Sequence, residues 1–352
     1  MAQRQGISED PHTAGFLKRW QRCGACTVGV TLLCAAQCGV VAITWRDWLA
    51  PLSIIEPVPD SYAAVLWSIR LPRVLFAALV GAALGLSGAL TQGLFRNPLA
   101  DPGLLGISSG AACAAALTLL LFSDLDIPFL SAWSLNLLPL AAFLGALLLC
   151  LLLERIARYS ANSIAGLLLV GVALNALCGA VIGLSSYLAT DNQLRSLSFW
   201  MLGSLSAAQW PWVALLAILL LLAAARARSL ASSLNALALG ISAATHVGID
   251  VVRLRGQIVL LVAVLSGFAT AWCGIIGFIG LIAPHFVRLA FGSDQRWVIA
   301  LSMYAGALLL LLADTLARTV LLPAEIPVGI FTALLGAPCF LLLLQRMRRQ
   351  LE

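Results

Sequence analysis

The chain has 352 residues, of which 61% are hydrophobic and only 10% are charged. A soluble domain has about half of its residues apolar and about a quarter charged, so this composition excludes an ordinary water-soluble enzyme. The net charge of +6 comes from 21 Lys and Arg against 15 Asp and Glu, and no basic run is interleaved with aromatic residues, which argues against nucleic-acid binding.

Apolar segments long enough to cross a bilayer recur from near residue 24 to near residue 345. A helix that crosses about 30 Å of hydrocarbon needs roughly 20 apolar residues. The sequence therefore predicts an all-α polytopic membrane protein with about ten transmembrane helices, at residues 24–44, 72–95, 103–122, 136–154, 164–188, 211–225, 257–277, 279–291, 297–317 and 326–345.

Two of these segments are unusual. The first is interpreted as a retained helix rather than a secretory signal, because 23 residues precede it, Glu9 and Asp10 interrupt that region, and no small-residue cleavage site closes it. The eighth has 13 residues, too few to cross alone. Gly277, Gly280 and Pro284 indicate a broken or partly inserted element there. Such an element is an expected place for a transport pathway.

The distribution of basic residues predicts that both termini are cytoplasmic. Five arginines fall on the outer side, and sixteen basic residues fall on the cytoplasmic side: Arg4, Lys18, Arg19, Arg22, Arg96, Arg155, Arg158, Arg226, Arg228, Arg253, Arg255, Arg288, Arg296, Arg346, Arg348 and Arg349. The expected organisation is a cytoplasmic tail at 1–23, one permease domain at 24–345 with a cytoplasmic loop at 226–256, and a cytoplasmic tail at 346–352.

Small residues predict close helix packing. Gly81 and Gly85 form a GxxxG pair that Gly88 extends, and Gly274, Gly277 and Gly280 recur at every third position. The nine cysteines lie mostly in apolar stretches and are interpreted as small hydrophobic residues, with no metal site expected at the CxxC of Cys23 and Cys26.

The sequence lacks the residues of an enzyme or an ATPase. The chain has a single lysine, Lys18, and no phosphate-binding loop, so any ATP and Mg²⁺ must be bound by a partner. His246 and His285 are expected in or beside cytoplasmic loops, without a catalytic partner. No cofactor is expected in this chain. A membrane enzyme that uses haem or a quinone would need paired ligands, and no two histidines occupy facing spans.

Asp314 and Arg318 are four residues apart on one face of the ninth segment, near its outer end. An ion-coupled carrier would want such a carboxylate at mid-membrane, so that class stays open as an alternative. An outer-end ion pair or a docking charge is the favoured interpretation, because neighbouring spans hold no second carboxylate for a relay.

The cytoplasmic stretch from Leu234 to Gly248 is apolar but too short and too glycine-broken to span. Leucine and alanine side chains that are exposed to the cytoplasm predict a soluble protein partner that covers them.

Four sequence blocks resemble the FecCD-type permeases of bacterial importers for iron chelates, haem and cobalamin. They are RLPR at 70–73, GLFRNPLADPGLLG at 93–106, GFIGLIAPH at 277–285, and PAEIPVG at 323–329 followed by LGAP at 335–338. The resemblance covers nearly the whole chain. It implies a type II importer in the bacterial inner membrane, in which this subunit pairs with a second copy, two ATP-binding cassette ATPases and a periplasmic binding protein. It also implies a pseudo-two-fold repeat of helices 2–5 and 7–10.

The resemblance further implies roles for particular residues. Arginines of the RLPR block and one further along would dock onto glutamates of the binding protein, and they match Arg70, Arg73 and Arg318. The ATPase-coupling residues would be Leu234, Asn235, Ala238, Leu239, Gly240, Ala244 and Gly248, with Gly240 and Gly248 setting the turns. The cytoplasmic gate would lie at Asn162, Ser163, Ile164 and Ala165, where the cobalamin permeases have small hydroxyl residues in place of Ile164 and Ala165.

The expected cargo is haem, because the LSFWMLGSL stretch at 197–205 and the loop lengths look most like haem permeases. A ferric siderophore or cobalamin remains the alternative. The same Pro284–His285 pair occurs in permeases for other cargoes, so His285 is not taken as an iron ligand.

Overall fold

The computed structural model of the chain describes residues 11–39, 41–49, 62–122, 134–159 and 164–351, and helices dominate these ranges. Each of the ten expected spans coincides with a helix: α1 (Pro11–Gln37), α4 (Leu71–Phe95), α5 (Ile107–Phe122), α7 (Ser134–Tyr159), α8 (Ile164–Leu188), α10 (Trp210–Ala238), α12 (Val251–Cys273), α13 (Ile279–Phe291), α14 (Gln295–Thr319) and α15 (Val328–Leu351). No strand occurs in the described ranges, so the all-α prediction is confirmed.

Six helices of the described chain are long and apolar enough to cross a membrane, namely α4, α7, α8, α10, α12 and α14. Shorter apolar helices occur in α5, α13 and α15. The connections hold the short helices α2 (Trp45–Leu49), α3 (Ala63–Val65), η2 (Leu66–Arg70), η3 (Pro102–Leu105), α9 (Asp191–Met201) and α11 (Ile241–His246). The chain is therefore a polytopic membrane protein, as expected.

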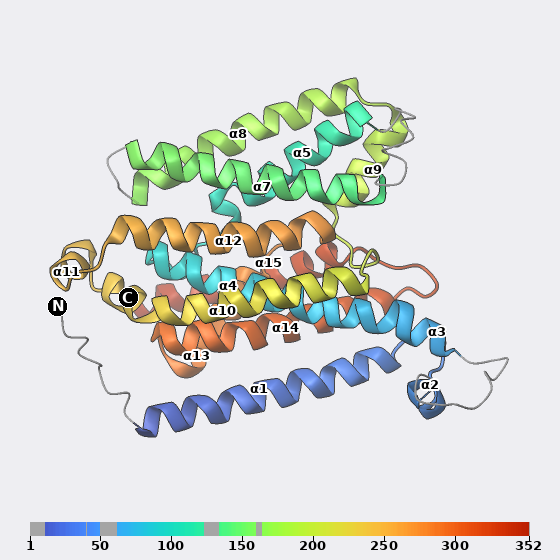
Figure 1. The fold of residues 1–352 in the computed structure, drawn as a ribbon, viewed down its shortest axis with the longest axis horizontal. Helices are drawn as coiled ribbons and strands as arrows, with labels where there is room; N and C mark the ends of the chain where they lie inside the picture. Colours follow the sequence, from blue (N-terminus) through green and yellow to red (C-terminus); the bar gives the residue numbers. More distant parts are fainter. Residues whose placement is uncertain (1–10, 40, 50–61, 123–133, 160–163, 352) are drawn as a thin grey trace.

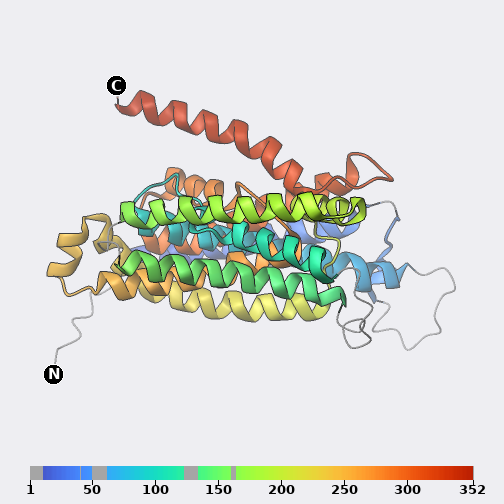
Figure 2. The same cartoon turned by 90° about the horizontal axis from the view of Figure 1, so that it is seen from above.

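The helices form an elongated bundle with two distinct ends (Figure 1). One end carries α11, the start of α1 and the end of α15, and is called the α11 end. The other carries α2, α3 and α9, and is called the α9 end. Helices α5, α7 and α8 lie on one side of α12, while α4, α10 and α14 lie on the other, with α1 beside α14. In the view from above, α15 leans away from the bundle towards its C-terminus (Figure 2).

Helix packing follows the expected repeat, which pairs α4 with α12, α5 with α13, α7 with α14 and α8 with α15. Helix α5 packs on α7, and correspondingly α13 packs on α14. Helix α7 packs on α12, and correspondingly α14 packs on α4. Each of these contacts therefore has a counterpart between the corresponding helices of the other half, as a pseudo-two-fold repeat requires.

The glycines of α4 pack as the small-residue pattern predicts. A Cβ at Gly81 would lie 2.3 Å from the carbonyl oxygen of Gly306, and one at Gly85 would lie 2.1 Å from that of Ser302, both on α14. A Cβ at Gly88 would lie 1.7 Å from the carbonyl oxygen of Gly280 on α13. Only glycine permits these backbone approaches, so helices α13 and α14 are held against α4.

The chain is interrupted between α12 and α13, as the glycines predict. Gly274 has φ +69°, and a Cβ there would lie 2.0 Å from the carbonyl oxygen of Trp200. The carbonyl of Cys273 accepts a hydrogen bond from Ser204 N at 2.7 Å, so non-helical backbone here is satisfied by protein. His285 was expected in or beside a loop; it is instead inside α13 and buried, because α13 begins at Ile279 within the bundle.

The expected loop at 226–256 is mostly helical, which corrects that prediction. Helix α10 continues to Ala238, and α12 already begins at Val251. Leu234 and Leu237 are fully buried, so the last turns of α10 stay helical because they pack on the bundle. The predicted tails are also partly helical, since α1 begins at Pro11 and α15 extends to Leu351. The length of an apolar stretch predicts only the part of a helix that lies in hydrocarbon, so it does not predict where the helix begins or ends outside that layer.

Candidate functional site: charged networks and exposed surfaces at the two ends

Two arginines and two carboxylates form a network at the α9 end. Asp314 Oδ1 accepts hydrogen bonds from Arg73 Nε at 3.1 Å and Nη2 at 3.0 Å, and Asp314 Oδ2 lies 3.1 Å from Arg318 Nε. Arg73 Nη1 also donates to Glu325 Oε2 at 2.7 Å. The predicted ion pair of Asp314 and Arg318 is confirmed, and Arg73 is its third member.

Arg70 and Arg318 also hold the C-terminal end of α1. Arg318 donates to the carbonyl oxygens of Ala35 at 3.1 Å and Cys38 at 3.3 Å, and Arg70 donates to those of Ala36 at 3.3 Å and Val41 at 2.6 Å. The last carbonyls of a helix lack partners in the helix itself, so cationic side chains stabilise them.

The structure therefore brings the three expected docking arginines together and buries them. Arg70, Arg73 and Arg318 are 6%, 9% and 7% exposed. Their donors point to Asp314, Glu325 and the backbone at and just beyond the end of α1. Glu325, whose side chain is 49% exposed, is the member at the surface, and sequence reasoning missed it although it stands in the PAEIPVG block. The docking role itself stays a prediction.

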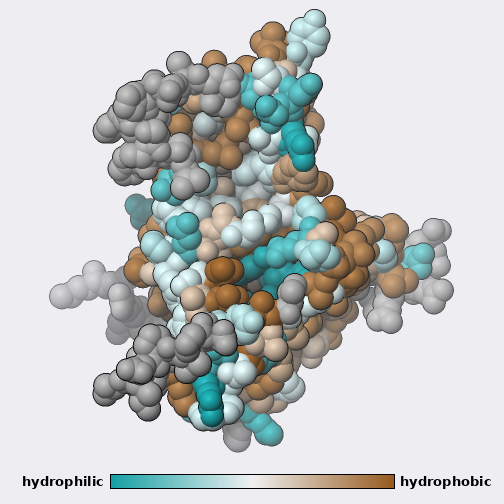
Figure 3. Space-filling view, turned by 90° about the vertical axis from the view of Figure 1, so that its right-hand side faces the viewer, coloured by the Kyte–Doolittle hydropathy of each residue, from teal (hydrophilic) through white to brown (hydrophobic). Residues whose placement is uncertain are grey.

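Figure 3 shows the α9 end face on: one patch of hydrophilic side chains lies near the middle, further hydrophilic side chains lie towards the top and the bottom, and hydrophobic side chains lie among them.

The four blocks that carry the resemblance meet in space. Arg73 of the first pairs with Glu325 of the fourth. Pro102 of the second lies 3.1 Å from where a Cβ of Gly280 in the third would be, and Phe278 of the third lies 2.4 Å from that of Gly336 in the fourth. In the second block, Asp101 Oδ1 accepts from Gly103 N at 2.7 Å, and burial raises the pKa of Asp101. The blocks are therefore contact surfaces between elements.

The expected coupling residues divide into buried and exposed ones. Leu234 and Ala244 are fully buried, whereas Leu239 is 81% exposed. Ala238 and Gly248 are also exposed, while Gly240 is half-buried. Gly240 has φ +123° and Gly248 has φ +81°, so the two glycines do form the turns on either side of α11, as predicted.

Exposed apolar side chains cluster around α11. Besides Leu239, Val247 is 69% exposed and Ile241 is 38% exposed. Apolar side chains concentrated on a short helix at the end of a bundle are typical of a protein contact surface.

Asn235 is a structural bridge in this conformation. Its Nδ2 donates to Asp294 Oδ1 at 2.7 Å, and its Oδ1 accepts from the backbone N–H of Gln295 at 2.8 Å. Asp294 is the N-cap of α14. Asn235 thus ties the end of α10 to the start of α14.

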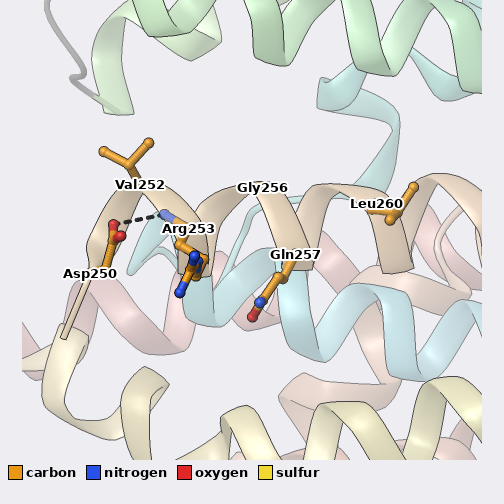
Figure 4. A pocket seen from close by; sticks show the side chains of 6 residues that line it. All are labelled: Asp250, Val252, Arg253, Gly256, Gln257 and Leu260. Atoms are coloured by element: carbon orange, nitrogen blue, oxygen red, sulfur yellow. Dashed lines mark hydrogen bonds between the residues drawn. The ribbon is translucent and has the colours of Figure 1, made fainter.

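Beside α11 an open cavity of about 420 Å³ lies along the first turns of α12 (Figure 4). It is lined by Asp250, Val252, Arg253, Gly256, Gln257 and Leu260. Asp250 Oδ1 caps α12 by accepting from Arg253 N at 2.9 Å. A second cavity, of about 400 Å³, shares Asp250, Arg253 and Gln257 and reaches α10. Both cavities lie where α11 leads into α12, and sequence reasoning did not single them out.

A second buried ion pair lies at the α11 end. Arg255 Nε donates to Glu154 Oε2 at 3.0 Å, and both side chains are 6% exposed. Sequence reasoning counted Arg255 only as a cytoplasmic loop charge. The signal that could have found the pair is a single carboxylate, Glu154, among the leucines of the fourth apolar segment.

Of the four expected gate residues, Asn162 and Ser163 lie outside the described residues. Ile164 and Ala165 are the first two residues of α8. The gate assignment therefore stays a prediction.

Among the described residues no group of three or more His, Cys, Asp and Glu is placed to hold a metal ion. The buried His285 has no hydrogen-bond partner at Nδ1. Nearby on α13, Arg288 Nη1 donates to Gln92 Oε1, and Gln92 Nε2 donates to the carbonyl oxygen of Leu281 at 3.1 Å. These contacts join α13 to α4.

Comparisons with known proteins agree with the fold and the blocks. Residues 27–346 match the FecCD transport family. The chain is 46% identical over 322 residues to a hemin transport system permease protein of Yersinia pestis, covering 91% of this chain and 93% of that one. It is 39% identical over 331 residues to a vitamin B12 import system permease protein of Vibrio cholerae, covering 94% and 95%.

A solved structure supports the same conclusion. The inward-facing conformation of a transporter assigned to the metal-chelate ABC type superposes with a TM-score of 0.80 at 30% identity, covering 94% of this chain and 99% of that one. The chain therefore belongs to the FecCD transport family and is an ABC importer permease, a non-catalytic membrane subunit whose ATPase is a separate chain.

Proposed function

We propose that this chain forms the passage for haem in a bacterial importer. The observation that carries the cargo is the 46% identity to a hemin permease over 322 residues, against 38–42% for the vitamin B12 permeases among the relatives. Cobalamin is the second candidate because matches to those relatives cover 80–94% of this chain, and a ferric siderophore is the third.

In this proposal two copies of the chain line the passage, two ATPase subunits bind ATP and Mg²⁺ at the cytoplasmic side, and a periplasmic binding protein delivers the cargo. The α11 end lies on the cytoplasmic side of the inner membrane, and both termini lie on that side. The charge distribution supports this orientation. The helix ends that lie at the α11 end carry the basic residues that the positive-inside rule assigns to the cytoplasm.

The exposed surface of α11 is the proposed binding site for the ATPase. Leu239 and Val247 would be covered by it, and Arg253 and Asp250 beside them offer polar contacts. Movement of α11 would pass through Asn235 to the start of α14 and through Gly248 to α12. Closure of the ATPases would in this way change the helix arrangement around the passage.

The network at the α9 end is the proposed seat of the binding protein. Arg70, Arg73 and Arg318 carry three positive charges against two on Asp314 and Glu325, which leaves one positive charge for an acidic partner. Asn162, Ser163, Ile164 and Ala165 remain the proposed gate. Asp314 does not suit an ion-coupled carrier, because two arginines share its carboxylate.

The test is reconstitution of the chain with its ATPase in liposomes. We expect ATP-dependent uptake of haem, supplied with its cognate binding protein, and no comparable uptake of cobalamin or a ferric siderophore. Uptake of another cargo would retain the importer and reject haem, and uptake without ATP would reject the mechanism.

A paired variant tests the coupling surface. Leu239→Ser with Val247→Ser should weaken capture of the ATPase, whereas Leu321→Ser, which also removes an exposed leucine but at the α9 end, should not. Equal capture by the double variant and the parent would place the ATPase elsewhere.

A further inference from the structure

A cavity of about 310 Å³ lies between α1, α10 and α14, on a different side of α10 from the cavities beside α11. Its polar lining includes Gln21, Arg228, Ser232 and Arg296, and its apolar lining includes Leu17 and Ile299. Three helices from distant parts of the sequence thus line an open pocket with two guanidinium groups, of which Arg228 is exposed and Arg296 is half-buried.

The two guanidinium groups have no partner within the part of the chain that the structure describes. No hydrogen bond or ion pair is formed by the side chain of Arg228 or of Arg296, and no carboxylate lines the cavity. Asp294, two residues before Arg296, has Oδ1 occupied by Asn235 Nδ2 and by the backbone N–H of Arg296. Two unpaired cations in one cavity attract an anion with several acceptor oxygens.

Aromatic residues beside the cavity indicate its depth in the bilayer. Phe16 and Trp20 of α1 pack edge-on against Trp297 of α14 and Phe291 of α13, with ring centroids 5.3 Å and 4.9 Å apart. Tryptophan concentrates at the headgroup level of membranes. Trp20 precedes Gln21 and Trp297 follows Arg296, so the cavity lies at that level.

The surroundings suit a lipid more than a soluble anion. Lys18, Arg19 and Arg22 are exposed on the same part of α1 and add positive charge near the membrane surface. Leu221, which is 71% exposed, precedes Arg228 by two helical turns on the same face of α10 and points an apolar side chain towards the hydrocarbon side of the cavity.

We propose that this cavity binds the phosphate of an anionic phospholipid headgroup. Arg228 and Arg296 hold the phosphate oxygens, Ser232 and Gln21 offer further donors, and the acyl chains run along α10 past Leu221. Basic pockets between transmembrane helices recognise anionic headgroups by this chemistry. The lipid would also fill the space between the start of α1 and the bundle, so it would hold α1 in place.

The test is a lipid titration of the purified full chain in detergent, followed by native mass spectrometry, with phosphatidylglycerol against phosphatidylcholine. We expect retention of phosphatidylglycerol by the parent and about tenfold or greater weakening in Arg228→Gln with Arg296→Gln, since each arginine near the surface contributes roughly a factor of five. Arg155→Gln with Arg253→Gln removes the same charge from exposed positions at the same end, outside this cavity, and should retain the lipid.

A variant that keeps the charge completes the test. Ser232→Leu narrows the cavity, and we expect it to weaken retention while thermal unfolding stays near that of the parent. Equal retention by the parent and the Arg228/Arg296 variant would overturn the proposal. Equal loss in the Arg155/Arg253 variant would show attraction to bulk charge only, and displacement of the lipid by inorganic phosphate would assign the cavity to a soluble anion; either result would also overturn it.

Discussion

The two ends of the molecule carry related buried ion pairs. Arg73 on α4 pairs with Asp314 on α14, and Arg255 on α12 pairs with Glu154 on α7. The repeat relates α4 to α12 and α14 to α7, so both pairs join corresponding helices. The carboxylates also correspond in position, since Asp314 and Glu154 each stand five residues before the last residue of their helix.

The pair at the α9 end is part of a larger set of contacts. At the α9 end, Asp314 is shared with Arg318, and Arg73 also holds Glu325, so the pair extends to α1 and to the connection before α15. Helix α1 precedes the repeat. An inverted repeat supplies one ion pair at each end, and the second arginine at the α9 end secures a helix that has no counterpart in the repeat.

The largest expected effect is that of Asp314→Ala. It leaves Arg73 and Arg318 buried beside each other without their shared carboxylate, which should reduce the free energy of unfolding by an amount at the upper end of about 3–5 kcal/mol. The measurement is the thermal unfolding midpoint of the chain in detergent. Asp191→Asn, at an exposed carboxylate of the α9 end, is the matched control, and an unchanged midpoint for Asp314→Ala would show that the network is not stabilising.

Glu154→Ala tests the pair at the α11 end and should cost about 3 kcal/mol, because it leaves Arg255 buried without this carboxylate. Replacing both partners, as Glu154→Leu with Arg255→Met, should recover most of the loss, since well-packed apolar residues replace a buried pair at little cost. The same unfolding measurement applies. A double variant as unstable as Glu154→Ala would mean that the pair positions the helices in a way that apolar packing cannot.

The next effect concerns the helix interfaces that carry the two pairs. Gly81→Ala at the α4–α14 interface should cost about 1–3 kcal/mol, because the new Cβ meets a backbone carbonyl 2.3 Å away. Gly267→Ala at the corresponding α7–α12 interface meets the Ala146 side chain at 3.3 Å and should cost less. Gly29→Ala, in open space on α1, controls for helix propensity. Similar losses at Gly81 and Gly267 would contradict the closer approach of α4 and α14.

The smallest expected effect is that of Glu325→Gln. Its side chain is half exposed, and Arg73 keeps Asp314, so the loss of unfolding free energy should stay below about 1 kcal/mol. Added salt should reduce this difference further, and unfolding at two ionic strengths measures it. A loss as large as that of Asp314→Ala would show that Glu325, rather than Asp314, holds the network together.

Much of the fold follows from the sequence alone. The short eighth segment was predicted at residues 279–291, and α13 occupies those residues. This agreement has a physical cause, since backbone in hydrocarbon must satisfy its own hydrogen bonds, so an apolar segment of a given length has few alternatives to a helix. The spacing of Gly81, Gly85 and Gly88 also predicted a close helix contact, because it leaves one helix face without side chains.

The candidate site was only partly predictable. Arg70, Arg73 and Arg318 were identified as a group, but their burial was not, because the partner of Arg73 on α14 is 241 residues away in the sequence. The apolar residues at 234–248 were expected to face a partner together. In the structure Leu234 packs inside the bundle and Leu239 is exposed, and no local pattern separates two leucines five residues apart.

The sequence by itself determined that this is a membrane protein, where its helices lie and which end of the bundle is rich in positive charge. Those properties depend on composition within single segments of about 20 residues. Only the tertiary structure decided that Asp314 serves two arginines, that Arg255 meets Glu154 and that Arg228 and Arg296 share a cavity. Each of these depends on the rotation of one helix against another, which is fixed by packing between residues far apart in the chain.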